Sequence, residues 1–127
     1  MIVVDASAAV LALVNAGEAR RRLQVEELHA PALVDSEVVH VIRRQERAGM
    51  LGPAEASRVI DTWRRLGVRR HSAQGQIDRM WALRYNLTGY DATYVALAEA
   101  LGCELVTADR RLTGTPKVGC TMTLVTS

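Results

Sequence analysis

The chain has 127 residues, of which 49% are hydrophobic and 24% charged, and its net charge is +2. These values are typical of one globular domain with its own core, so we expect a single domain over residues 1–127. The apolar runs are too short to span a membrane, and Met1–Asp5 lacks the basic start and long apolar stretch of a signal peptide.

Hydrophobic periodicity predicts strands that alternate with helices. A β-branched apolar run that stops at an acid predicts a buried strand at Met1–Asp5. Further strands are predicted at Val68–His71, Cys103–Thr107 and Met122–Val125. The predicted helices, in chain order, are Ala6–Asn15, Glu18–Leu28, Ser36–Met50, Ala54–Leu66, Ile77–Tyr85 and Asp91–Leu101.

Strands separated by helices indicate parallel pairing through right-handed crossovers. The expected fold is therefore α/β, a helix-rich three-layer α/β/α sandwich around a small central parallel sheet. In such open sheets, ligands bind beyond the carboxyl ends of the strands. Two acids lie at such ends in the predicted arrangement: Asp5 ends the first strand, and Asp109 follows the strand Cys103–Thr107 by two residues.

Four acids stand at the starts of helices or the ends of strands, and each has a simple structural explanation. Asp5 can cap the helix that follows it, and Glu37 can be a first-turn acid that the helix dipole favours. Thr88 and Asp91 have the spacing of a capping box, and Asp109 can begin a turn. Taken singly, each acid is better explained in this way.

Taken together, the same four acids favour a metal site. They are predicted to lie at one end of the sheet, and strongly apolar segments adjoin each of them. Carboxylates gathered beside a core repel one another unless a cation lies among them. Oxygen ligands without thiolate or imidazole select Mg²⁺ or Mn²⁺ over zinc. The four acids are Asp5, Glu37, Asp91 and Asp109.

Arginine and cysteine add little by themselves. Of the 16 basic residues, 15 are Arg, in clusters that can bind nucleic-acid phosphates, although a solvated surface with an arginine bias explains any single cluster more simply. Cys103 and Cys120 have no metal-ligand spacing. We expect both to be packing residues in a reducing cytoplasm.

Four segments carry a resemblance to a known family: Val3–Ser7, Pro31–Glu37, Tyr90–Ala98 and Leu105–Asp109. In them the sequence resembles the PIN domain family, in particular the VapC toxins of bacterial toxin–antitoxin pairs. The most specific element is the Tyr-Asp-Ala block followed by Thr-x-Asp at this distance. The resemblance extends over nearly the whole chain.

This resemblance implies an endoribonuclease that binds Mg²⁺, or Mn²⁺ in its place, through the four carboxylates. Asp5 and Asp91 would be the firmest ligands, with Asp109 next and Glu37 acting through water. Ser7 and Thr107 match positions of small hydroxyl residues that orient the carboxylates or a water, and local capping explains them equally well. Because Arg110-Arg111 follows Asp109 where some relatives carry another acid, the number of metal ions stays open.

The resemblance also implies a reaction and partners. Water would attack an RNA phosphodiester in line, leaving a 5′-phosphate, and the RNA would be a loop or single strand. The protein would form a homodimer and bind a VapB-type antitoxin in a heterotetramer or larger assembly, in the cytoplasm and away from membranes.

Three alternatives remain open at this point. A haloacid-dehalogenase-like phosphatase also has Asp after its first strand, but it needs an acid where Ser7 stands and a well-placed lysine, and Lys117 is the only one. A metal-free ribonuclease would need a histidine pair, whereas His29, His40 and His71 show no mutual spacing. A non-catalytic PIN-like binding module would use the acid pocket only to hold a partner.

Overall fold

A five-stranded parallel sheet forms the centre of the computed structural model, which describes all residues 1–127. Its strand order is β3-β2-β1-β4-β5, and every neighbouring pair is parallel. The strands are β1 (Ile2–Val4), β2 (Leu28–Pro31), β3 (Arg69–His71), β4 (Glu104–Thr107) and β5 (Met122–Leu124).

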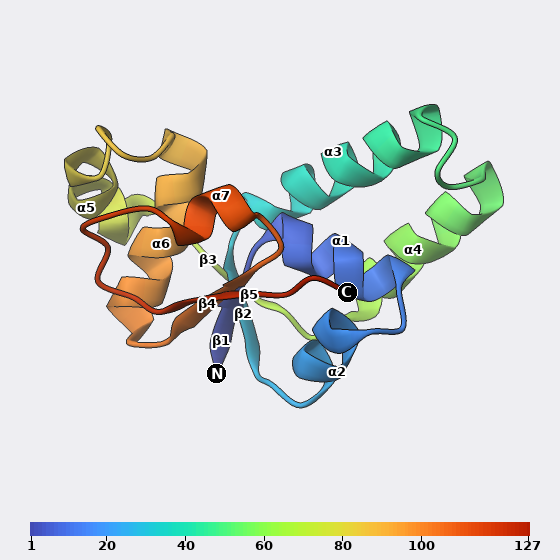
Figure 1. Ribbon diagram of the computed structural model, residues 1–127, viewed down its shortest axis with the longest axis horizontal. Helices are drawn as coiled ribbons and strands as arrows, with labels where there is room; N and C mark the ends of the chain where they lie inside the picture. Colours follow the sequence, from blue (N-terminus) through green and yellow to red (C-terminus); the bar gives the residue numbers. More distant parts are fainter.

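Helices cover both faces of this sheet, which confirms the three-layer α/β/α sandwich. One layer holds α1 (Ala6–Val14), α2 (Glu18–Gln24), α3 (Val34–Arg47) and α4 (Pro53–Arg65), and the other holds α5 (Ile77–Ala82) and α6 (Gly89–Leu101). A 3₁₀ turn, η1 (Gln74–Gln76), precedes α5, and a short α7 (Arg110–Thr113) follows β4 (Figure 1). None of the helices combines the length and apolar character that crossing a membrane requires.

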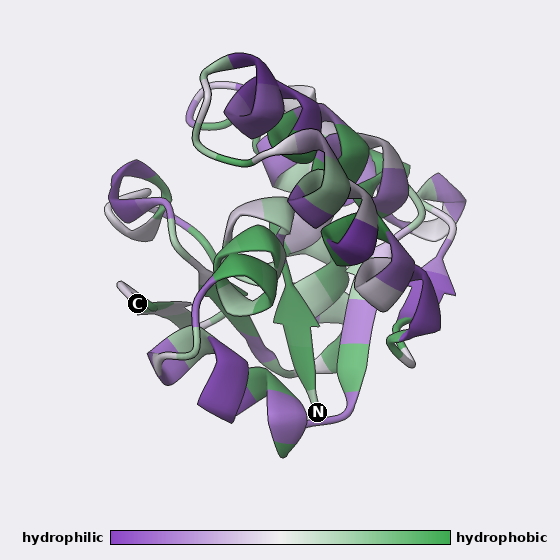
Figure 2. Cartoon of the chain, turned by 90° about the vertical axis from the view of Figure 1, so that its right-hand side faces the viewer, coloured by the Kyte–Doolittle hydropathy of each residue, from purple (hydrophilic) through white to green (hydrophobic).

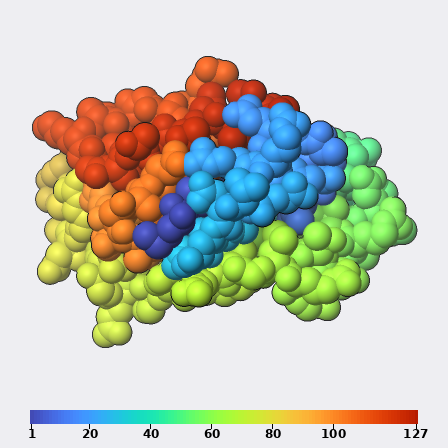
Figure 3. Space-filling view, turned by 90° about the horizontal axis from the view of Figure 1, so that it is seen from below, coloured from blue at the N-terminus to red at the C-terminus, as the bar shows by residue number.

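The central strand β1 accounts for the most apolar part of the core. Ile2, Val3 and Val4 are all buried, because β1 has strand neighbours on both edges and helices on both faces. This explains why the strand is an unbroken apolar run instead of an alternating one. Figure 2 shows the same contrast, with green strands and a green helix inside and purple segments outside. Seen from below, the first residues (dark blue) lie between the light-blue segment of α2 and β2 and the orange segment of α6 and β4 (Figure 3).

One predicted helix was too long and concealed a strand. The helix predicted over Glu18–Leu28 ends at Gln24, and Leu28–Pro31 forms β2. The residues of β2 are buried and pair with β1 on one side and β3 on the other. Long-range pairing thus overrides a local pattern that is compatible with helix. Pro31 is tolerated at the last position of the strand.

The other boundaries differ from prediction by a few residues. The third and fourth helices begin before the predicted positions, α4 with Pro53 in its first turn, where proline is pre-organised for helix. Helix α6 begins at Gly89 because Thr88 caps it, accepting the backbone N–H of Asp91. The short α7 was not predicted from sequence. Residues Ala92–Ala98 of α6 are buried all round, since this helix fills the centre of its layer.

The chain leaves β1 toward one edge of the sheet and later returns to β4 on its other side. The direction of winding therefore reverses between β1 and β4, and at such a switch point the loops after the two strands diverge to leave a crevice. The predicted pairing of these two strands is confirmed, and their carboxyl ends lead into Asp5 and Asp109. The fold thus brings two of the four acids to the same edge of the sheet.

Candidate functional site

Asp5 is a buried carboxylate held entirely by donors. It is the N-cap of α1, where Oδ1 accepts the backbone N–H of Ala8 at 2.9 Å and the hydroxyl of Ser7 at 2.6 Å. The hydroxyl of Thr107, at the end of β4, donates to Oδ2. The side chain is 6% exposed and cannot swing out without losing all three bonds. Its orientation is fixed by the β1–α1 turn and the end of β4 together.

Ser7 and Thr107 form a hydroxyl pair that ties this turn to the β4–α7 loop. Their oxygens lie 3.3 Å apart. Besides donating to Asp5, Ser7 accepts the backbone N–H of Ala108 at 2.9 Å, and Thr107 accepts that of Asp109 at 3.0 Å. Ser7 does not cap α1, because Asp5 does. Both hydroxyls are placed as an orienting pair would be.

The environment of Asp5 makes its negative charge costly. Burial raises the pKa of Asp5, and the nearby charge of Asp109 raises it further, whereas the bonds from Ser7, Thr107 and the Ala8 N–H oppose the rise. No basic side chain contacts Asp5. A cation bound beside it would relieve this cost.

Glu37 lies in the first half of α3 and meets α6. The phenol of Tyr94 donates to Glu37 Oε1 at 2.6 Å. Tyr94 is buried, and its pKa is raised by burial, by this bond and by the negative charges of Glu37, Asp5 and Asp91. One phenol therefore lies within the field of three of the four acids, and it remains a hydrogen-bond donor at any physiological pH.

Asp91 and Asp109 share a basic partner, Arg111. Asp109 is the N-cap of α7, and its carboxylate accepts both the backbone N–H of Arg111, at 3.0 Å, and the guanidinium Nη2, at 2.9 Å. The same Nη2 lies 3.5 Å from Asp91 Oδ2. The hydrogen bond from the Arg111 guanidinium to Asp109 lowers the pKa of Asp109. The arginine thus bridges the start of α6 to the β4–α7 loop.

Asp5 and Asp109 follow the carboxyl ends of β1 and β4, and the charges of the four predicted acids act on common neighbours, Tyr94 and Arg111. As a donor set they fit a hard divalent cation, because they are carboxylates without thiolate or imidazole. In the present side-chain arrangement, no three acidic, histidine or cysteine side chains lie close enough to coordinate one ion together. Their role as metal ligands stays a prediction.

Sequence reasoning missed the roles of Tyr94 and Arg111. Tyr94 follows Asp91 by three residues, which puts both on one face of α6, and this spacing is the only local signal for it. From sequence, Arg111 belongs to one of the arginine clusters and stands where some relatives carry an acid, but no contact with Asp91 was predicted for it. Its contact with Asp91 depends on how α6 approaches the β4–α7 loop.

The histidines are less scattered than their spacing predicted. His29 is buried in β2, and its Nδ1 lies 2.8 Å from Nε2 of His71 in the neighbouring strand β3. Its Nε2 lies 2.7 Å from Glu27 Oε1. Strand pairing created this contact, which residue numbers do not reveal. The pair belongs to the β2–β3 half of the sheet, whereas the acids surround the ends of β1 and β4.

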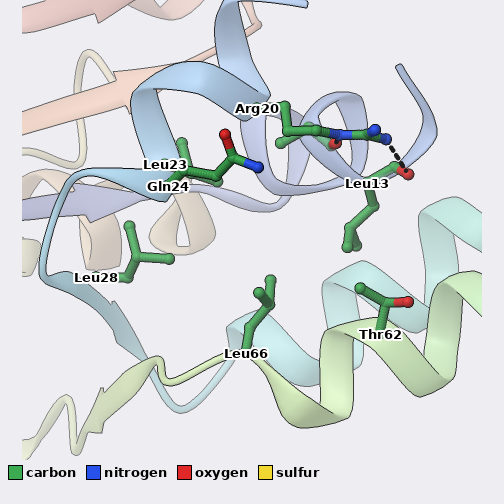
Figure 4. A pocket seen from close by; sticks show the side chains of 8 residues that line it. Leu13, Arg20, Leu23, Gln24, Leu28, Thr62 and Leu66 are labelled. Atoms are coloured by element: carbon green, nitrogen blue, oxygen red, sulfur yellow. Dashed lines mark hydrogen bonds between the residues drawn. The ribbon is translucent and has the colours of Figure 1, made fainter. Parts of the chain in front are cut away.

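A separate apolar cavity of about 390 Å³ lies between α1, α2, β2 and α4. Leu13, Leu23, Leu28 and Leu66 line it, and Arg20 at its rim donates to the backbone carbonyls of Ala12 and Leu13 (Figure 4). Arg20 thereby satisfies carbonyls at the carboxyl end of α1. None of the four acids lines this cavity.

The sequence matches the PIN domain family over residues 2–118. It is 53% identical over 125 residues to VapC ribonuclease Mb0985 of Mycobacterium bovis and to ribonuclease VapC9 of Mycobacterium tuberculosis, with 98% of each chain covered. Ribonuclease VapC1 of Mycobacterium tuberculosis is 38% identical over 128 residues, covering 97% of this chain and 96% of the relative.

Two solved structures share the fold. PAE2754 from Pyrobaculum aerophilum superposes with a TM-score of 0.68 at 28% identity, covering 95% of this chain and 81% of the other. VapC20 of Mycobacterium tuberculosis, a toxin that cleaves the sarcin–ricin loop, superposes with a TM-score of 0.64 at 20% identity, covering 93% and 98%.

Proposed function

This chain belongs to the PIN domain family, and we propose that it is a VapC-type toxin, an endoribonuclease that depends on Mg²⁺ or Mn²⁺. Identity of 53% over nearly the full length to proteins named VapC ribonucleases supports the activity. The metal site is proposed mainly on Asp5, a buried carboxylate that accepts hydrogen bonds from Ser7 and Thr107. No basic residue contacts Asp5, and the negative charge of Asp109 nearby raises its pKa.

Each acid has a place in this proposal. Asp5, fixed by Ser7 and Thr107, and Asp91, at the start of α6, would be the main ligands of the cation. Asp109 would complete the set from the β4–α7 loop. Glu37 keeps Oε2 free of protein bonds while Tyr94 holds Oε1, so Oε2 is the atom able to accept a proton from water.

The proposed reaction is hydrolysis of an RNA phosphodiester. A bound divalent cation supplies charge stabilisation at a phosphoryl oxygen and makes nearby water more acidic. Glu37 Oε2 accepts a proton from the attacking water, whose oxygen forms the new bond to phosphorus. The bond from phosphorus to the ribose 3′-oxygen breaks, and the products carry a 3′-hydroxyl and a 5′-phosphate.

As partners we propose single-stranded or loop RNA as substrate, and a VapB-type antitoxin that covers the acidic site. A homodimer, and a heterotetramer or larger assembly with the antitoxin, are proposed on the family relationship. Induced expression of the chain in a bacterial host should arrest growth, and coexpression of the protein encoded beside its gene should relieve the arrest.

The direct test compares RNA cleavage by the purified wild type with that by Asp5→Asn. A suitable control is Asp78→Asn, which removes an exposed acid of α5 that makes no hydrogen bond or ion pair. We expect Asp5→Asn and chelation of the wild type each to abolish cleavage, added Mn²⁺ to restore it in the chelated wild type, and Asp78→Asn to cleave normally. Cleavage that survives both the substitution and the chelator overturns the metal-dependent mechanism.

A further inference from the structure

The chain places one of its own cations among the four carboxylates. Arg111 Nη2 lies 2.9 Å from Asp109 Oδ2 and 3.5 Å from Asp91 Oδ2, so a single nitrogen contacts two of the predicted ligands. Asp5, in contrast, is satisfied by hydroxyls and a backbone N–H and contacts no arginine. Asp91 and Asp109 therefore have a basic side chain beside them, whereas Asp5 has none.

The ion pairs of Arg111 with Asp91 and Asp109 are weak enough for a divalent cation to displace the guanidinium. The Arg111 side chain is 74% exposed while both carboxylates are partly buried, and an ion pair with one such exposed partner is weakened because water screens its charge. Its backbone stays in place when the side chain leaves, since the Asp109 carboxylate also caps α7 through the Arg111 N–H. The guanidinium can therefore move while α7 and the carboxylates remain.

We propose that Arg111 is a built-in counter-ion that competes with the divalent cation for Asp91 and Asp109 and, once displaced, binds a phosphate of the RNA. This inference rests on the proposed metal site and says how the chain itself regulates it.

Once displaced from the carboxylates, the guanidinium of Arg111 could bind a phosphate group of the RNA. Its fork of N–H donors suits the paired oxygens of phosphate as well as those of carboxylate. A metal that neutralised the carboxylates would remove the attraction that holds Arg111, and the exposed side chain lies beside the acids that would bind the metal. Arg111 should therefore oppose metal binding and favour RNA binding.

Opposite effects on two ligands make the inference testable without measuring cleavage. In Arg111→Ala, the affinity for Mn²⁺ alone, measured by titration calorimetry or electron paramagnetic resonance, should rise about 3- to 10-fold, as expected for removal of a screened competing charge. The affinity for a labelled single-stranded RNA in saturating Mn²⁺ should fall about 3- to 10-fold, the size of one lost phosphate contact. The RNA measurement is made in the Glu37→Gln background so that the RNA stays intact.

The chain supplies a matched control in Arg110→Ala. Arg110 is the neighbouring residue of α7, is also exposed, and its guanidinium makes no ion pair or hydrogen bond. Arg110→Ala should leave the Mn²⁺ affinity unchanged and alter RNA affinity less than Arg111→Ala does. Arg111→Lys, which keeps the charge but loses the fork, should give values between wild type and Arg111→Ala.

The outcomes separate this inference from the proposed function. If wild type and Arg111→Ala bind Mn²⁺ equally well, the competition is overturned while the metal site stands. Equal effects of the Arg110 and Arg111 substitutions would also overturn it, because they would reflect overall charge alone. If wild type, Arg111→Ala and Asp5→Asn all fail to bind Mn²⁺, the metal site itself is overturned and the competition with it.

Discussion

The phenol of Tyr94 donates a hydrogen bond to Oε1 of Glu37 at 2.6 Å, across 57 positions of sequence. Glu37 belongs to α3 and Tyr94 to α6, which lie in opposite helix layers. The bond therefore joins the first turn of α3 to the second turn of α6. Asp91 lies one turn before Tyr94 on α6, and its charge and that of Glu37 both raise the pKa of Tyr94.

The bond predicts the behaviour of Tyr94→Phe. Without the phenolic O–H, Glu37 keeps its charge but loses the donor that orients it, so metal affinity and cleavage should fall by about 10- to 100-fold, as for other residues that orient metal ligands. The free energy of unfolding should fall by about 1 kcal/mol, because a partly buried carboxylate loses one hydrogen bond. Mn²⁺ titration, RNA cleavage and thermal unfolding measure the three effects.

Tyr90→Phe is the matched control for that experiment. Tyr90 is a phenol on the same helix, but it is 65% exposed and makes no hydrogen bond within the chain. It should leave metal affinity and stability at wild-type values. A Tyr94→Phe protein with wild-type Mn²⁺ affinity would show that Glu37 does not need its orienting bond.

Asp5→Asn should make the metal-free protein more stable while making it inactive. Burial and the charge of Asp109 both raise the pKa of Asp5, so its ionised form is costly in the folded state. An amide occupies the same space without the charge, and the hydroxyl of Thr107 can turn to accept from it. We expect the free energy of unfolding at neutral pH, in chelator, to rise by about 1–2 kcal/mol.

The pH dependence of this difference has a definite sign. A carboxyl whose pKa is raised on folding binds protons more tightly in the folded chain, so wild type gains stability as pH falls through the folded pKa towards the unfolded value of about 4. Asp5→Asn lacks that gain. The stability difference between the two proteins should therefore be largest near neutral pH and shrink with acidification, as measured by urea unfolding at several pH values. A constant difference would contradict the assignment.

The sequence was sufficient to predict that Asp5 and Asp109 lie near each other, because both follow strands with strong local signals. The apolar run of β1 ends at Asp5, and that of β4 leads to Asp109 within two residues. Parallel pairing then places them together, since parallel strands end on the same edge. Asp91 is likewise fixed near the start of α6 by the Thr88 cap.

The contacts that sequence could not predict all join elements distant in the chain. Strand β2 exists because β1 and β3 pair with it, although the residues before it look helical. The bond of Tyr94 to Glu37 and the reach of Arg111 to Asp91 depend on how helices from different layers approach, which periodicity does not encode. Hydrophobic pattern thus predicted the elements that carry the four acids, whereas tertiary packing determines that Tyr94 and Arg111 contact them.

The His29–His71 pair should contribute to stability and not to catalysis. Because the Glu27 carboxylate only accepts, His29 Nε2 donates to it, which leaves His29 Nδ1 to accept from His71 Nε2. His71→Phe leaves the buried Nδ1 without a donor and should lower the free energy of unfolding by about 1–2 kcal/mol. His71→Gln keeps a donor and should lose less. RNA cleavage below the unfolding temperature should be unchanged in both, and its loss in a folded variant would revive the histidine mechanism.

Asp35 offers the opposite pH dependence to Asp5, at a position outside the acid site. Its carboxylate accepts two bonds from the Arg70 guanidinium, at 2.6 and 2.8 Å, and one from the Trp63 indole at 2.9 Å, so it joins α3 to α4 and to the edge strand β3. These contacts lower the pKa of Asp35, with Arg70 the main cause.

Asp35→Asn should therefore destabilise the protein near neutral pH by about 1 kcal/mol, a modest value because the ion pair is partly exposed. A carboxyl whose pKa is lowered on folding stabilises the fold above its unfolded pKa of about 4, and this contribution disappears as pH falls through the folded pKa. The difference between wild type and Asp35→Asn should thus vanish at strongly acid pH, in the range where the Asp35 proton binds the folded chain. Urea unfolding across pH measures it, and RNA cleavage serves as the control, because Asp35 contacts none of the four acids and its substitution should leave cleavage unchanged.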